Sequence, residues 1–121
     1  MLLVAALLIV VLGLAHSYLG ERYILIRLFR RNDLPKVLGS SQLTARTLRF
    51  AWHITTVGWF GFAALLIQIQ QDRLSSISAA RIIGYCCIAS GILPLVITRG
   101  RHLSWVVFFV VGGISLVWAT R

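Results

Sequence analysis

Three histidines and one glutamate are the side chains of this chain that could bind a metal ion or a haem iron. The histidines are His16, His53 and His102, and the glutamate is Glu21. Imidazole is the commonest metal ligand in proteins, so one interpretation is a site built on His16 and His53 with His102 or Glu21. The spacing gives it little support, because His16 and Glu21 lie about 140° apart on a straight helix. Both could face one ion only if the helix breaks, for example at Gly20.

Arginines near these residues suggest a second interpretation, an anion-binding site. Arg46, Arg49 and Arg99 would surround His53 with positive charge. A lipid headgroup, a phosphorylated substrate or a quinone carbonyl would fit, because guanidinium groups suit phosphate. A third interpretation needs no ligand. The histidines would then bond to backbone or water at a membrane edge, and Glu21 would pair with an arginine from another segment.

Catalysis has less support than these interpretations. The chain has three acidic residues, which is too few for paired acid–base chemistry at one site. Ser17 follows His16, but no third group orients that pair, and neither a phosphate loop nor a dinucleotide fingerprint is present. Cys86 and Cys87 are adjacent in an apolar run and are expected to be packing residues. We therefore favour a protein that is not an enzyme.

The elements that must position these groups are apolar segments of membrane-spanning length. Of the residues, 59% are hydrophobic and 12% charged, and the mean hydropathy is +0.89. A soluble domain is about half apolar and about a quarter charged. We therefore predict an all-α polytopic membrane protein, a single domain of residues 1–121 with four transmembrane helices in an antiparallel bundle. The expected helices cover about residues 2–19 with an extension to 31, then 41–70, 79–98 and 102–120.

The segment after the first helix is amphipathic. On a helical wheel its apolar and basic residues fall in opposite arcs, which is typical of a helix that lies in the headgroup layer. The apolar residues are Ile24, Leu25, Leu28 and Phe29, and the basic residues are Arg27, Arg30 and Arg31. We therefore expect an interfacial helix that contacts anionic lipid headgroups, followed by a loop and a serine cap at Ser40 or Ser41.

Basic residues are distributed unevenly between the connections. The first and third connections carry nine Lys and Arg residues, whereas the second connection and the C-terminal end carry three. The positive-inside rule then places the first and third connections in the cytoplasm and both termini on the other side. His16, His53, His102 and Glu21 would all lie near the cytoplasmic face. The compact chain, with no targeting segment beyond its first helix, is expected in a bacterial inner membrane.

The net charge of +9 does not indicate nucleic-acid binding, because the basic residues flank apolar segments and form no recognisable nucleic-acid motif. An ion-coupled carrier is also disfavoured, since no acidic residue lies within the membrane interior. We expect an accessory or assembly subunit, or a small membrane module, that acts through a larger membrane-protein partner or a homo-oligomer. The alternatives are a metal- or haem-binding protein that uses His16 and His53, a small oligomeric transporter, and a lipid- or anion-binding protein.

Overall fold

The computed structural model describes all 121 residues, and helices make up most of the chain, without any β-strand. This confirms the predicted all-α class. The elements are α1 (Leu2–Leu19), the π-helical turn η1 (Gly20–Leu25), α2 (Ile26–Leu28), α3 (Ser41–Gln70), α4 (Ser76–Ile97) and α5 (Ser104–Trp118). Helix α3 covers the same residues as the predicted helix 41–70, whereas α4 begins three residues before the predicted position and α5 begins two residues after it.

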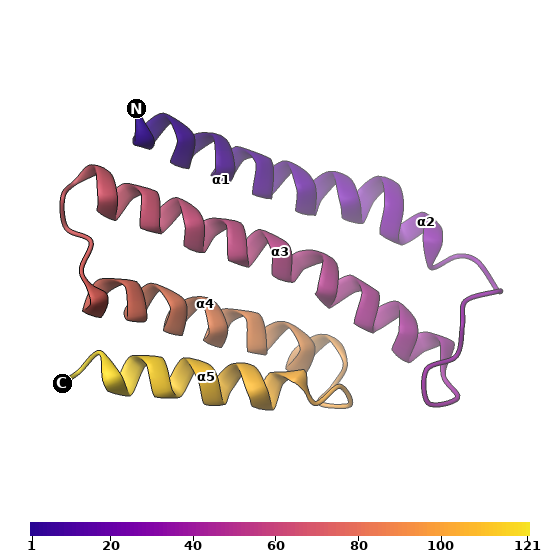
Figure 1. Cartoon of the computed structure of the whole chain (residues 1–121). Coiled ribbons are helices and arrows are strands. Elements are labelled where there is room, and N and C mark those ends of the chain that lie inside the picture. Colours follow the sequence, from indigo (N-terminus) through magenta and orange to yellow (C-terminus); the bar gives the residue numbers. More distant parts are fainter.

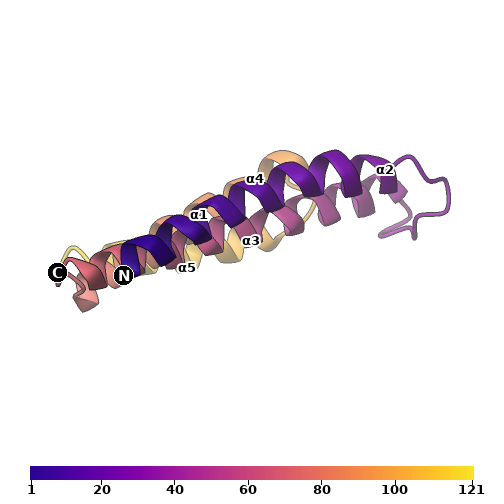
Figure 2. The same ribbon diagram turned by 90° about the horizontal axis from the view of Figure 1, so that it is seen from above.

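The four long helices form an open layer one helix thick. Figure 1 shows α1, α3, α4 and α5 side by side in chain order, and Figure 2 shows the same layer from above, with the helices behind one another. Each helix packs only on its neighbours in this order, so α1 touches neither α4 nor α5. The predicted antiparallel helices are therefore present, arranged as an open layer in chain order. In a bilayer the outward apolar faces can be covered by lipid, so hydrophobic burial does not force the layer to close.

Three helices are long and apolar enough to cross a membrane. They are Leu2–Leu28, with 27 residues, α3, with 30 residues, and α4, with 22 residues. Helix α5 is equally apolar but has 15 residues. At about 1.5 Å per residue this length reaches about 22 Å, which is less than the hydrocarbon core of about 30 Å. The structure thus supports a helical membrane protein, and the fourth crossing stays a prediction.

The predicted interfacial helix is not a separate element. Residues Gly20–Leu28 continue α1 in the same direction as one helix that ends at Leu28 (Figure 1). No proline interrupts this stretch, since the first proline of the chain is Pro35. The π turn η1 follows α1 at Gly20 without interrupting the helix. Arg27 therefore lies on the last turn of a long helix, and Arg30 and Arg31 follow directly after its end.

Glycines allow α4 and α5 to approach closely. A Cβ atom on Gly84 would lie 2.7 Å from Leu116 Cγ and 3.2 Å from the carbonyl oxygen of Gly112. A Cβ atom on Gly112 would lie 3.0 Å from the carbonyl oxygen of Gly84. Such contacts between small residues are the usual means of helix association in lipid. They confirm the expectation that these two helices are antiparallel neighbours.

The connections divide the layer into two ends. Both termini and the α3–α4 connection lie at one end, and the two arginine-rich connections lie at the other (Figure 1). Ser40 caps α3 by accepting a hydrogen bond from the backbone N–H of Leu43, which agrees with the predicted serine cap. The tight α4–α5 connection uses Arg99 and Gly100 at φ 55° and 77°. The basic residues of the first and third connections therefore gather at one end of the molecule.

Candidate functional site

Helices α1 and α3 meet near the arginine-rich end through a group of polar and aromatic side chains that we call the polar junction. Its residues are His16 and Ser17 of α1, Glu21 of η1, and Arg49, Trp52, His53, Thr55 and Thr56 of α3. Ser17 and Glu21 are four residues apart, and so are Arg49 and His53. Residues at this spacing share one face of a helix, so the two antiparallel helices present matching polar faces.

His53 links Ser17 to Glu21 across the interface. Its Nδ1 atom lies 2.8 Å from Ser17 Oγ, and its Nε2 atom lies 3.2 Å from Glu21 Oε2. An ionised carboxylate can only accept hydrogen bonds, so the His53 Nε2–H group is the donor to Glu21. Thr56 Oγ1 lies 2.7 Å from Ser17 Oγ and 3.2 Å from the carbonyl oxygen of Gly13. A continuous hydrogen-bonded chain thus runs from the buried Thr56 to Glu21.

Glu21 is also held by Arg49. Arg49 Nη2 lies 2.8 Å from Oε1, and Arg49 Nε lies 3.2 Å from Oε2, so the guanidinium binds both carboxylate oxygens. This two-point geometry is the strong form of an arginine–carboxylate pair. The Arg49 guanidinium also lies over the Phe29 ring, 5.0 Å from its centroid. The pairing confirms the expectation that Glu21 binds an arginine from another segment.

His16 packs in a different part of the polar junction. Its ring stacks on Trp52 with a centroid separation of 4.5 Å and an interplanar angle of 4°. Its Nε2 atom lies 3.0 Å from Thr55 Oγ1, while the Trp52 indole N–H donates to the His16 carbonyl oxygen at 3.1 Å. Gly20 lies beneath the same indole, because a Cβ there would be 2.1 Å from Trp52 Nε1. A glycine is therefore required where η1 begins.

The structure does not bring the four predicted metal ligands together. Within this set only His53 and Glu21 are in contact, while His16 contacts Trp52 and Thr55. His102 lies in the α4–α5 connection, where its Nδ1 atom is 2.9 Å from Ser104 Oγ and its ring packs edge-on against Phe50. No group of three or more His, Cys, Asp and Glu side chains in the chain is arranged to hold a metal ion.

The predicted anion-binding arginines also belong to different parts of the structure. Arg49 faces η1 and is paired with Glu21. Arg46 is partly exposed one turn earlier on α3, and Arg99 is exposed in the α4–α5 connection. Arg49 therefore acts within the polar junction, and its charge is already balanced by a carboxylate of the same chain.

The chain from Ser17 through His53 to Glu21 has the composition of a nucleophile, a base and an orienting acid. Two features distinguish it from an acyl-transfer site. Ser17 Oγ is shared between His53 and Thr56, and Ser17 lies within α1, where the backbone N–H groups are used in the helix. An oxyanion hole needs free donors beside the nucleophile. The arrangement fits a structural role, in which it holds α1 and η1 on α3.

Sequence reasoning missed Ser17 as a partner of His53 and did not include Trp52, Thr55 or Thr56 in the site. A signal was present, because Ser17 lies four residues before Glu21 and therefore on its face of the helix. The prediction instead combined Glu21 with His16, the residue next to Ser17, because histidine is the stronger metal-ligand type.

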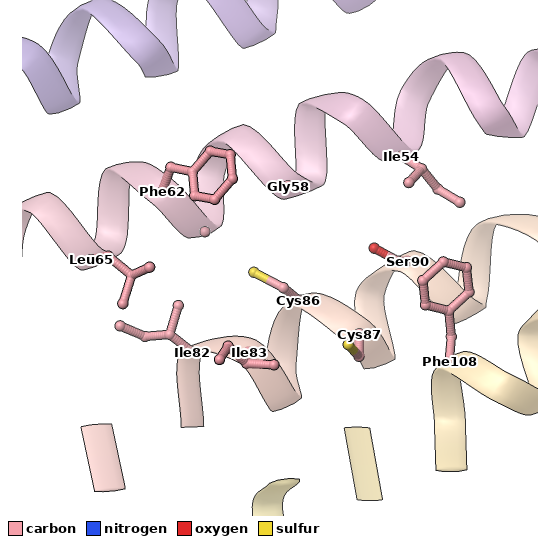
Figure 3. A pocket seen from close by; sticks show the side chains of 11 residues that line it. Ile54, Gly58, Phe62, Leu65, Ile82, Ile83, Cys86, Cys87, Ser90 and Phe108 are labelled. Atoms are coloured by element: carbon pink, nitrogen blue, oxygen red, sulfur yellow. The ribbon is translucent and has the colours of Figure 1, made fainter. Parts of the chain in front are cut away.

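A separate apolar groove of about 290 Å³ lies between α3 and α4, with Phe108 of α5 at its edge (Figure 3). Cys86 and Ser90 point from α4 toward α3 in this view, and both cysteines are free. A Cβ on Gly61 would lie 2.6 Å from Cys86 Sγ, so this cysteine packs directly against α3 at Gly61. The packing role expected for Cys86 is therefore confirmed.

Comparison of the chain with protein-family models, with curated proteins and with solved structures found no match.

Proposed function

We propose that this chain is a small multi-pass membrane protein with a non-enzymatic role, an accessory or assembly subunit that acts by association with a larger membrane protein. The observation that carries the proposal is the open layer of helices. A layer one helix thick has no interior in which a substrate can be enclosed or passed through the chain alone. Both faces of α3 and α4 are available to lipid or to another protein.

Four crossings are part of the proposal, although α5 is short. The packing of α5 supports this, because a Cβ on Gly91 would lie 2.7 Å from Phe109 and a Cβ on Gly84 would lie 2.7 Å from Leu116. These two contacts are seven residues apart on α4, so α5 follows α4 over about two turns. A helix packed along a membrane-spanning neighbour shares its depth in the bilayer.

The proposed orientation places the arginine-rich end in the cytoplasm of a bacterial cell and both termini on the other side of the inner membrane. Reporter fusions test this directly. Fusions after Lys36 and Arg99 should report a cytoplasmic location, and fusions after Gln71 and Arg121 should report the opposite side. Fusions after Lys36 and Arg99 that report opposite sides would contradict four crossings.

Association with a partner is tested by extraction in a mild detergent with a tag on the chain. We expect one larger membrane protein to co-purify at a fixed ratio, and an unrelated small membrane protein with the same tag should not retain it. Chemical cross-linking in intact membranes before extraction protects the test against loss of a weak complex. A solitary chain under both conditions would refute the accessory role.

A further inference from the structure

We infer that the outer surface of η1, α2 and the turn that follows them binds the phosphate group of an anionic phospholipid through Arg22, Arg27 and Arg30. These side chains, with Tyr23 and Ile26, line a small hollow of about 210 Å³ at the arginine-rich end. This site goes beyond the accessory role proposed above and does not depend on it. Arg27 and Arg30 belong to the segment for which headgroup contact was predicted, whereas Arg22 is a new member and none of the predicted set Arg46, Arg49 and Arg99 lines this hollow.

The π turn explains how the three arginines come together. On a regular α-helix Arg22 and Arg27, which are five residues apart, would point in directions about 140° apart. A π turn closes a hydrogen bond between residues five apart, and here the Ile26 N–H bonds to the Glu21 carbonyl oxygen. Arg22 therefore moves toward the face of Arg27 and Arg30. The same turn leaves Glu21 directed toward α3.

No carboxylate of this chain neutralises the three arginines. The chain has three acidic residues, and Glu21 is bound by Arg49 and His53, while Asp33 is bound by Arg31. The remaining one, Asp72, lies in the α3–α4 connection at the opposite end of the layer. Three guanidinium groups around one hollow favour an anion between them, because it offsets their mutual repulsion. Such an anion has to come from outside the chain.

The position of the hollow favours a lipid as the source of that anion. The helix Leu2–Leu28 has 27 residues. It would reach about 40 Å, so its last seven residues or so extend beyond a hydrocarbon core of about 30 Å. Arg22 and Arg27 lie on these turns and Arg30 lies in the turn directly after them, which places all three at the depth of the phosphate groups. Helix α1 is at the edge of the layer, so a lipid can reach the hollow from within its own leaflet.

The chemistry of the hollow suits a phosphate with an apolar attachment. Arginine binds phosphate through two parallel hydrogen bonds, and three arginines can share the oxygens of one headgroup. Tyr23 is exposed, and Arg27 lies over its ring at 5.8 Å from the centroid. An exposed tyrosine at the membrane interface is a common anchor for the headgroup region. The expected ligand is therefore phosphatidylglycerol or another lipid with a net negative phosphate.

Native mass spectrometry of the delipidated full chain in detergent tests the inference. Phosphatidylglycerol should form a one-to-one adduct at lower concentration than phosphatidylcholine. The triple variant R22Q/R27Q/R30Q should lose at least about tenfold in affinity for phosphatidylglycerol, since each arginine near a lipid surface contributes appreciably. The matched control R73Q/R81Q/R121Q removes the same charge at the opposite end and should retain the affinity. Far-UV circular dichroism establishes that both variants are folded.

Each other outcome overturns the inference in a distinct way. Equal affinity of R22Q/R27Q/R30Q and the unaltered chain would exclude these arginines as the site. An equal loss in both triple variants would show that net charge, and not the hollow, attracts the lipid. A further arm adds inorganic phosphate at millimolar concentration. If phosphate displaces phosphatidylglycerol at that level, the site is one for soluble phosphate, and the assignment to a lipid is wrong.

Discussion

Gly20→Ala is the most direct test of the way in which α1, η1 and α3 are held together. Gly20 has helical backbone angles, φ −61° and ψ −48°, so alanine is compatible with the backbone. The added methyl group would lie 2.1 Å from Trp52 Nε1 and 2.3 Å from Trp52 Cε2. The indole must therefore move away, and this movement removes its hydrogen bond to the His16 carbonyl oxygen and its stacking on the His16 ring.

The expected loss of stability follows from these contacts. Overpacking at a buried position costs about 2 kcal/mol, and the lost hydrogen bond costs about 1 kcal/mol. The lost aromatic stacking costs about 1 kcal/mol more. Alanine recovers about 1 kcal/mol, because it favours a helix more than glycine does. The net result is a decrease of about 3 kcal/mol in the free energy of unfolding, or roughly a hundredfold in the unfolding equilibrium.

Equilibrium unfolding in mixed micelles with increasing dodecyl sulfate, followed by tryptophan fluorescence and circular dichroism, measures this change. Gly58→Ala is the matched control, because a Cβ there meets no atom within 4 Å. It should leave stability unchanged or raise it slightly. In the double variant Gly20→Ala with Trp52→Leu, the first substitution should cost much less, since the clashing ring is gone. If Gly20→Ala is as stable as Gly58→Ala, the close packing of Gly20 and Trp52 is refuted.

Two further predictions concern charged groups. Glu21→Gln should lower the free energy of unfolding by about 1–2 kcal/mol, because Arg49 and His53 lose a charged acceptor that is partly open to water. The same unfolding experiment measures this change, and an unchanged stability would contradict the proposed role of this carboxylate. The hydrogen bond and the charge of Arg31 hold the pKa of the exposed Asp33 below its ordinary value. The pair therefore stabilises the loop at neutral pH, and this stabilisation is lost as the pH falls through the lowered pKa. A carboxyl NMR titration should show the Asp33 pKa returning upward in Arg31→Gln, and an unmoved titration would count against the pairing.

The helical class and the approximate positions of the helices were predictable, because they follow from the length and apolar character of segments and from local capping. Ser40 illustrates this, since a serine directly before a helical segment predicts a cap on physical grounds. The close pair of α4 and α5 was also accessible, since Gly84, Gly91 and Gly112 allow two backbones to approach in lipid.

The open layer and the π turn could not be predicted in the same way. Whether helices close into a bundle depends on contacts between elements that are distant in sequence. Lipid can cover the apolar helix faces in the open and in the closed arrangement, so the apolar pattern of the sequence favours neither. A helical wheel assumes a regular 3.6-residue turn, so it misplaces every residue after Gly20 relative to those before it. The direction of Arg22 relative to Arg27 could therefore not be read from a regular wheel, and neither could the separation of Glu21 from the outer arginines.

The π turn sets the direction of the charged side chains in both the polar junction and the hollow. It directs Glu21 toward Arg49 and His53, so the one carboxylate of this helix is used between α1 and α3. The outward arginines are left without a partner because of that same pairing. Glu21→Gln should therefore weaken the contact between the helices while leaving lipid affinity at the hollow unchanged, whereas R22Q/R27Q/R30Q should do the reverse. A substitution set that moved both quantities together would show that the two faces of η1 are not independent.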